Sequence, residues 1–387
     1  MKKLTIRYRR RLLYWANKRS RKKNSGTAKF GYVLSADRFD QVRLPSNAIQ
    51  MPKVFCLVQN TEQTLSFLEK TRQRLLAPPL SGTRSLAAHV TGKRKNKSAP
   101  RWIGPYVDFT TIEFISPAAA LVLAAEYHRA VLLKEQSTKN ISRLFLVDVH
   151  KWKANVIESL IEVGFFELLK ITEGVQAPEE GDRKILKLRS GSRNQADEVD
   201  GLLNSIEEMF SGVGLNANDA CFELNGALGE AMENAVRCAY PTEISFGRPH
   251  VSKWWMTGSL SKAQRQMTVA IYDQGVSIPG SLSSWQLYGG FLNRFLRKFG
   301  MARDSADPRF DGDVIALAID ESVTSTGLQK HGKGLGHIKA FIDSCSAGSL
   351  LIISRQGMYI YEKGKPPLTY NLPIRLSGTL IQWNVVI

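Results

Sequence analysis

The sequence has few cysteines and no long apolar run, and each absence excludes a class of protein. No stretch of eighteen uninterrupted apolar residues occurs in the 387 residues, so we expect no transmembrane segment. The lysines at the N-terminus are not followed by an apolar run, which argues against a secretory signal. The four cysteines lie far apart without a CxxC pair, which indicates reduced thiols instead of disulfides or a zinc site. We therefore expect a cytoplasmic globular protein of two or three domains.

Acidic residues are almost missing from the first quarter of the chain. Residues 1–105 contain 24 Lys and Arg against 4 Asp and Glu, whereas the remaining residues contain 29 against 31. Clustered like charge without acidic partners attracts polyanions. Tyr8, Tyr14 and Trp15 lie within the basic arm and can stack on bases or anchor in a membrane surface. Nucleic acid bound through residues 1–105 is therefore one expected partner, and a solubilising tail is the alternative.

After a basic arm and linker, residues 1–46, short apolar segments alternate with helical patterns. Residues 61–76 and 117–133 have helical patterns, and residues 143–149 have the composition of a buried strand. Alternating strands and helices are typical of an α/β fold. We therefore predict a small α/β domain over residues 47–189.

This domain resembles a STAS domain, the fold of anti-sigma-factor antagonists, at residues 107–117 and 159–168. In that family, an Asp-Ser-Ser-Gly-like turn carries a serine that is phosphorylated. The corresponding turn, residues 115–118, reads Ile-Ser-Pro-Ala and lacks both the Asp and the Gly. Ser116 is therefore expected to be an ordinary N-cap.

A polar hinge at residues 190–195 leads into a second predicted domain, residues 196–387. Its helix over residues 222–239 has an apolar stripe, and Glu230 and Asn234 lie one turn apart beside that stripe. A carboxylate so placed can accept a proton, and a carboxamide oxygen is a suitable ligand for Mg²⁺. The pair therefore predicts a site for a magnesium-bound phosphate.

A half-buried strand over residues 266–273 ends at Asp273 and is followed at once by a turn. The turn contains Gly275 and Ser277. A carboxylate at a strand end can accept the exocyclic amine of adenine, and a glycine lets the ring approach the backbone. This segment therefore predicts an adenine site.

A glycine-rich segment, residues 324–336, opens directly into a helix. Backbone N–H groups at a helix N-terminus bind anionic oxygens, and lysines add positive charge. The candidate phosphate-binding residues are Gly327, Lys330, Gly332, Lys333, Gly334, Leu335 and Gly336.

Together the three segments resemble the Bergerat ATP-binding fold of gyrase, MutL, large heat-shock chaperones and histidine kinases, and most closely that of the anti-sigma-factor serine kinases. The resemblance implies that Glu230 polarises the attacking water or hydroxyl, that Asn234 binds Mg²⁺, and that Asp273 binds adenine. It further implies that Gly275 lies at the ring edge and that residues 333–336 bind the phosphates of ATP. The implied fold class is α/β, with a C-terminal Bergerat-type α/β two-layer sandwich, an N-terminal STAS-like α/β domain and the basic arm.

The sequence departs from the family pattern at several positions. Ser277 stands where the family has a second glycine, which we expect to narrow the pocket, and Cys238 stands where a histidine often follows the first segment. No phosphoacceptor-histidine helix precedes the domain, so a sensor histidine kinase is not expected. Residues 285–309 form an insert that we expect to be a lid-packing helix, and a groove for a partner is the alternative.

The leading hypothesis is a cytosolic ATP-binding regulator that binds Mg-ATP, hydrolyses it slowly or passes on its terminal phosphoryl group, and responds to a regulatory protein partner. One alternative is a serine/threonine kinase that acts on a separate antagonist or on Ser116. A second alternative is a nucleic-acid-associated ATP switch.

Overall fold

The computed structural model describes residues 30–35, 38–44, 48–76, 101–102, 106–136, 144–171, 183–211, 218–282, 288–300, 304–324 and 334–386. Within these residues helices and strands are mixed, in agreement with the predicted α/β class. Among their helices, none combines the length and the apolar composition that crossing a bilayer requires.

The N-terminal part of the fold is built from short strands around helices. Its strands are β1 (Phe30–Ser35), β2 (Arg38–Arg43), β3 (Ile49–Gln50), β4 (Val54–Phe55), β5 (Arg101–Trp102), β6 (Val107–Asp108), β7 (Phe114–Ile115) and β8 (Leu146–Val147). Its helices are α2 (Thr61–Leu76), α4 (Pro117–Gln136), α5 (Ala154–Glu162) and α6 (Phe165–Leu168), with a 3-10 turn at Val149–Lys151. β3 pairs with β6 and β4 pairs with β7, both in parallel, and a four-stranded sheet has the order β5-β2-β1-β8.

The β1–β2 hairpin corrects the prediction that residues 1–46 are an arm and linker. Its strands pair antiparallel, and Val33 and Val42 are buried. Buried and exposed side chains alternate along a strand with one covered face, and residues 30–33 alternate in this way. Residues 30–43 contain only two Arg and no Lys, so this segment lacks the dense positive charge of the arm before it. Of residues 1–46, residues 1–29, 36–37 and 45–46 lie outside the described part of the chain.

The C-terminal part contains a large antiparallel sheet. Its order is β10-β11-β12-β16-β13-β14-β15, and β9 also pairs with β11. The strands are β9 (Arg183–Ile185), β10 (Arg189–Gly191), β11 (Trp254–Ser261), β12 (Gln266–Asp273), β13 (Ala347–Ser354), β14 (Gly357–Glu362), β15 (Leu368–Asn371) and β16 (Thr379–Val386). β9 and β10 thus belong to this sheet, although the sequence placed the end of the first domain at residue 189.

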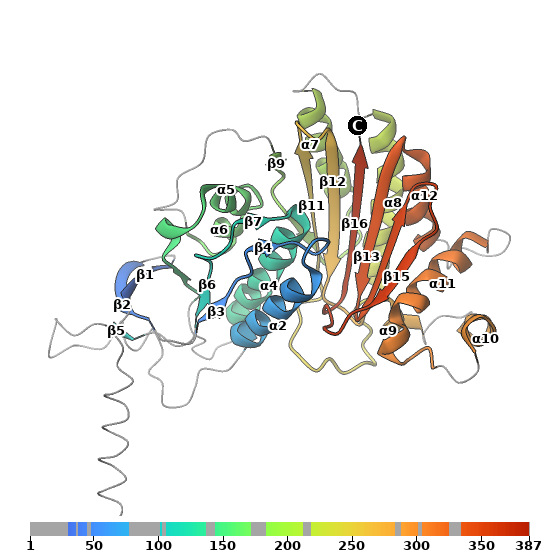
Figure 1. The fold of residues 1–387 in the computed structure, drawn as a ribbon, viewed down its shortest axis with the longest axis horizontal. Coiled ribbons are helices and arrows are strands. Elements are labelled where there is room, and N and C mark those ends of the chain that lie inside the picture. The colour runs from blue at the N-terminus through green and yellow to red at the C-terminus, as the bar shows by residue number, and fades with distance from the viewer. Residues whose placement is uncertain are drawn as a thin grey trace, which may run out of the picture.

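Helices cover one face of this sheet. They are α7 (Ala196–Ser211), α8 (Asn218–Arg237), α11 (Asp311–Thr324) and α12 (Gly334–Ser344), which pack on the sheet and on one another (Figure 1). The shorter helices are α9 (Ile278–Ser281) and α10 (Tyr288–Phe299), and a 3-10 turn spans Pro308–Phe310. The predicted insert therefore contains a helix, α10, which contacts α11.

Helix α4 of the N-terminal part covers β11 and β12 on the opposite face of the sheet (Figure 1). Alternation along β12 turns Ile271 toward the helix layer, whereas Ala270 and Tyr272 belong to the same apolar core as α4. A helix that is apolar all round is buried on all sides. The apolar composition of α4 follows from its place between the N-terminal elements and the sheet.

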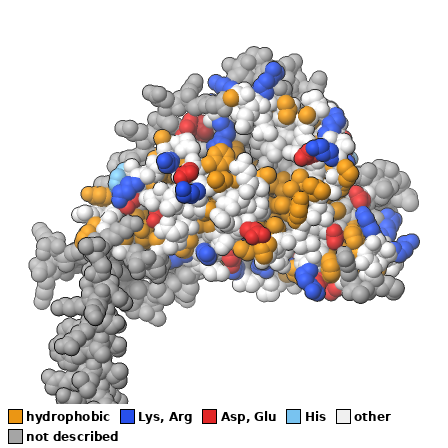
Figure 2. Space-filling view, viewed as in Figure 1, with side chains coloured by type: hydrophobic (Ala, Val, Ile, Leu, Met, Phe, Trp, Pro, Cys, Tyr) orange, Lys and Arg blue, Asp and Glu red, His pale blue; other side chains and the backbone are white. Residues whose placement is uncertain are grey.

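The strands of the large sheet that α4 does not cover expose apolar side chains. Apolar side chains gather over the strands on the right of the view in Figure 2. On β15, Leu368 and Tyr370 are 54% and 45% exposed.

Candidate functional site

A pocket opens between the helix layer and one end of the sheet. Its empty volume, including the open mouth, is about 480 Å³. The lining residues are Ala231, Asn234, Ala235, Cys238, Ala239, Asp273, Ser277, Ile278, Ser281, Leu335, Thr379 and Ile381. The structure thus brings together residues from all three segments that the sequence analysis selected.

Asp273 is the buried carboxylate of this pocket, at the end of β12. Its Oδ1 accepts a hydrogen bond from the N–H of Gly275 at 2.7 Å. Burial raises the pKa of Asp273 to about 7, although the backbone N–H groups of Gly275 and Thr379 lower it. A carboxylate with spare acceptor capacity on an otherwise apolar wall can recognise a ligand that donates a hydrogen bond.

Asn234 lies on the pocket wall, on α8. Its Nδ2 is buried and has no hydrogen-bond partner among the described residues. Buried polar groups are normally paired, so this carboxamide has the environment of a ligand-binding group.

Glu230 lies one turn before Asn234, where its carboxylate meets α12. Its Oε1 is 3.4 Å from Nδ1 of His337, and both side chains are partly exposed. His337 is a candidate site residue that sequence reasoning missed. Its only signal was its position directly after Gly336, at the start of a helix that packs on α8.

Gly275 is required by a close backbone contact. A Cβ at this position would lie 2.2 Å from the carbonyl oxygen of Ala239, which also accepts the N–H of Val276 at 2.8 Å. Gly275 is not among the residues that line the pocket. Because glycine has no side chain, the turn after β12 can lie against the residues that follow α8. This contact shapes the pocket indirectly.

Ser277 has backbone angles that normally require glycine. Its φ is 84° and its ψ is 164°, a region that is essentially restricted to glycine. Its hydroxyl accepts the N–H of Gly280 at 3.2 Å and so caps α9. Ser277 lines the pocket, and its backbone conformation is one that glycine adopts without strain.

The glycine-rich segment is described only at its end. Gly334 begins α12, Leu335 lines the pocket, and Gly336 is buried in the first helical turn. The other predicted phosphate-binding residues, Gly327, Lys330, Gly332 and Lys333, lie outside the described residues.

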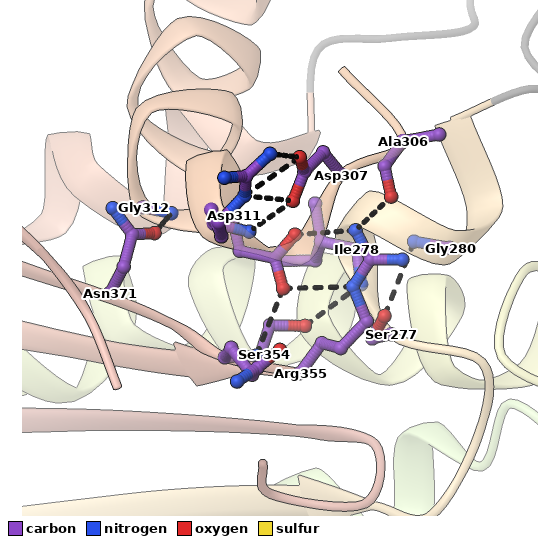
Figure 3. Close-up of polar contacts among 12 residues, drawn as sticks. Ser277, Ile278, Gly280, Ala306, Asp307, Asp311, Gly312, Ser354, Arg355 and Asn371 are labelled. Carbon is purple, nitrogen blue, oxygen red and sulfur yellow. Dashed lines mark hydrogen bonds and ion pairs between the residues drawn. The ribbon is translucent and has the colours of Figure 1, made fainter. Parts of the chain in front are cut away.

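Polar contacts hold the part of the pocket that lies behind Ser277. We call this part, which Thr379 lines and Ser354 supports, the floor of the pocket. Thr379 lies opposite Asp273 on β16, and its hydroxyl is 2.8 Å from that of Ser354 on β13. Ser354 Oγ in turn accepts the N–H of Ile278 at 2.8 Å (Figure 3). Sequence reasoning missed Thr379 and Ser354, because strand pairing between distant segments brings them to the pocket.

An ion pair holds the segment before α11 to the same floor. The carboxylate of Asp311 is fully buried and accepts Nε of Arg355 at 2.8 Å (Figure 3). Arg355 also donates to the carbonyl of Ala306 at 3.1 Å. Because Arg355 follows Ser354, these contacts join residues 306–311 to the strand that supports Thr379.

Asn234 could supply one ligand of a magnesium ion whose other ligands come from a bound phosphate group and water. Within the described ranges, no group of three His, Cys, Asp or Glu residues could hold a metal by itself. Magnesium in nucleotide sites takes one or two protein oxygens, with phosphate oxygens and water completing its shell. The carboxamide oxygen of Asn234 can supply one such ligand.

No family model matches the chain, and no curated protein sequence matches it.

Proposed function

We propose that this protein is an ATP-binding regulator whose C-terminal part is a Bergerat-type nucleotide domain. The observation that carries the proposal is the position of Asp273, Asn234 and Leu335 around one pocket. These residues come from three segments that resemble the conserved segments of that ATPase superfamily.

The apolar wall and the single buried carboxylate suit a purine base. In this proposal the ionised carboxylate of Asp273 accepts the exocyclic amine of adenine, and the side chains of Ala235 and Ile381 contact the ring. Guanine presents a carbonyl oxygen at the corresponding position, which would face a carboxylate. The pocket is therefore expected to prefer ATP to GTP.

The polar edge of the pocket suits phosphate. The N-terminus of α12, which begins at Gly334, carries the positive end of the helix dipole, and the first N–H groups of a helix can bind phosphate oxygens. Asn234 would hold a magnesium ion, which neutralises phosphate charge when bound. Glu230 would accept the proton of the attacking water or hydroxyl at its carboxylate, with His337 beside it.

The N-terminal part would be a built-in STAS-like partner of this domain. Helix α4 packs on β11 and β12, on the face of the sheet opposite the pocket. Asp273 and Tyr272 are consecutive on β12, so a nucleotide and α4 act on adjacent residues of one strand.

Nucleotide titration tests the proposal. Calorimetry with ATP, ADP and GTP, each with and without Mg²⁺, should show saturable binding of the adenine nucleotides and weaker binding of GTP. Incubation with ATP labelled at the γ-phosphate then separates hydrolysis from protein phosphorylation. Free labelled phosphate supports the regulator, and label on the protein or on an added partner supports the kinase. Equal, weak binding of all three nucleotides would contradict the proposal.

A further inference from the structure

A buried ionic cluster joins α4 to the strand that carries Asp273. Glu126 of α4 is fully buried, and its carboxylate accepts Nη2 and Nε of Arg72 at 2.6 and 3.1 Å. Arg129, one turn further along α4, also donates to it. The fourth donor is the hydroxyl of Tyr272, 3.1 Å from Oε1 of Glu126. A charge that is removed from water in this way is stabilised only by partners held in good geometry.

The hydroxyl of Tyr272 has two acceptors within reach and a single proton. Besides Glu126, the carbonyl oxygen of Ser377 lies 2.8 Å away. Burial raises the pKa of Tyr272 well above its usual value, so the hydroxyl remains a neutral donor. A phenolic hydroxyl donates one hydrogen bond at a time, so these two acceptors compete for it.

Ser377 begins the segment that leads into the floor of the pocket. The next residue, Gly378, has a φ of 89°, and a Cβ there would lie 2.0 Å from the carbonyl oxygen of Asp273. Thr379 follows and lines the pocket beside Asp273. A displacement of Ser377 is therefore passed within two residues to the pocket floor, where close backbone packing leaves little freedom.

We infer that Tyr272 is a positioning residue through which α4 sets the affinity of the pocket for ATP. When its hydroxyl is held between Glu126 and Ser377, residues 377–379 stay in the arrangement that pairs Thr379 with Asp273. When that hydroxyl is lost, the carbonyl of Ser377 loses its donor and the floor is less well ordered for ligand binding. The inference rests on the proposed nucleotide function.

A simpler view is that the cluster only fastens the two parts of the chain together. In that case any contact between α4 and the sheet should matter equally. His128 of α4 provides the comparison, because its Nδ1 accepts the indole N–H of Trp255 on β11 at 3.0 Å. The ring of Trp255 lies beside that of Tyr272, but this hydrogen bond does not use the Tyr272 hydroxyl.

The test compares three single substitutions in the full chain by ATP calorimetry. Tyr272→Phe keeps the ring and removes the hydroxyl, and it should raise the Kd for Mg-ATP about five- to tenfold. Tyr359→Phe is the matched control, since the buried hydroxyl of Tyr359 on β14 has no partner among the described residues. His128→Ala loosens α4 at another point. Both controls should stay within about twofold of the wild-type Kd.

A second measurement does not depend on nucleotide. Hydrogen exchange of the ligand-free protein, followed in peptides that cover residues 372–381, should be about five- to tenfold faster in Tyr272→Phe and unchanged in Tyr359→Phe. An unchanged Kd for Tyr272→Phe, or an equal loss of affinity in His128→Ala, would overturn the inference. If the wild-type protein binds no ATP, the proposed function fails, and unchanged exchange would then separately overturn the positioning role.

Discussion

The carboxylate of Glu230 and the imidazole of His337 meet across two helices, with Oε1 3.4 Å from Nδ1. Glu230 is on α8 and His337 is in the first turns of α12, where the glycine-rich segment ends. This contact brings the candidate proton acceptor to the helix N-terminus that would hold the phosphates.

Replacement of Glu230 should separate binding from chemistry. Glu230→Ala is expected to leave the Kd for Mg-ATP within about threefold and to lower the hydrolysis rate by about 100-fold or more, because a proton acceptor acts mainly in the transition state. Calorimetry and single-turnover phosphate release measure the two effects. Glu233→Ala is the control, since Glu233 forms a surface ion pair with Arg237. Loss of ATP binding in Glu230→Ala, or hydrolysis at the wild-type rate, would disprove the assigned role.

Ser277→Gly should stabilise the protein. The observed φ of 84° and ψ of 164° strain a serine, and relief of such strain is worth about 1–3 kcal/mol. The lost cap on Gly280 and the greater freedom of glycine in the unfolded chain offset part of this gain. We expect a net increase of about 1 kcal/mol in the free energy of unfolding, measured by urea denaturation. Ser281→Gly, in α9, should instead be destabilising; a loss of stability in Ser277→Gly would contradict the account.

The raised pKa of Asp273 predicts opposite effects of pH on stability and on binding. The folded carboxyl titrates near 7, above its unfolded value, so its contribution to stability is fully present below about pH 4 and is lost as the pH rises to about 7. Adenosine should bind better as the carboxylate ionises, and its Kd should rise about tenfold for each pH unit below 7. Adenosine has no phosphate to titrate, which isolates the protein group. A Kd that is constant from pH 5.5 to 8 would rule out this role for the carboxylate.

The basic first quarter predicts salt-dependent binding of a polyanion. Residues 1–105 carry 24 Lys and Arg against 4 Asp and Glu. Duplex DNA binding should weaken with salt, with a slope in log K against log salt of about −0.9 for each phosphate contact. Deletion of residues 1–25 should remove this binding and leave ATP binding intact. Fluorescence anisotropy at several salt concentrations measures this binding. If the intact protein binds neither DNA, RNA nor anionic vesicles at low salt, the solubilising-tail alternative is supported.

The sequence predicted the elements with strong periodicity. The bounds of β12, Gln266–Asp273, and of α2, Thr61–Leu76, agree with their predicted ranges, because alternation and helical spacing are local properties. Asn234 and Asp273 line one pocket, and their assignment to a nucleotide stays a prediction.

Contacts between distant segments could not be predicted in this way. Glu126 and Arg72 are charged residues within helices, a pattern that normally indicates a solvent-facing surface, yet both are buried and paired with each other. Thr379 enters the pocket only through pairing of β16 with β12. These features depend on which elements pack together, and local periodicity carries no information about that choice.

The most direct test of the central claim is the affinity of Asp273→Asn for Mg-ATP. Asparagine keeps the size of the side chain but presents an N–H group where adenine requires an acceptor, so binding should be lost while the ligand-free protein becomes more stable at pH 8. Asp200→Asn, at an exposed position on α7, should bind ATP like the wild type. Wild-type affinity in Asp273→Asn, measured by calorimetry beside this control, would contradict the assignment of the pocket to ATP.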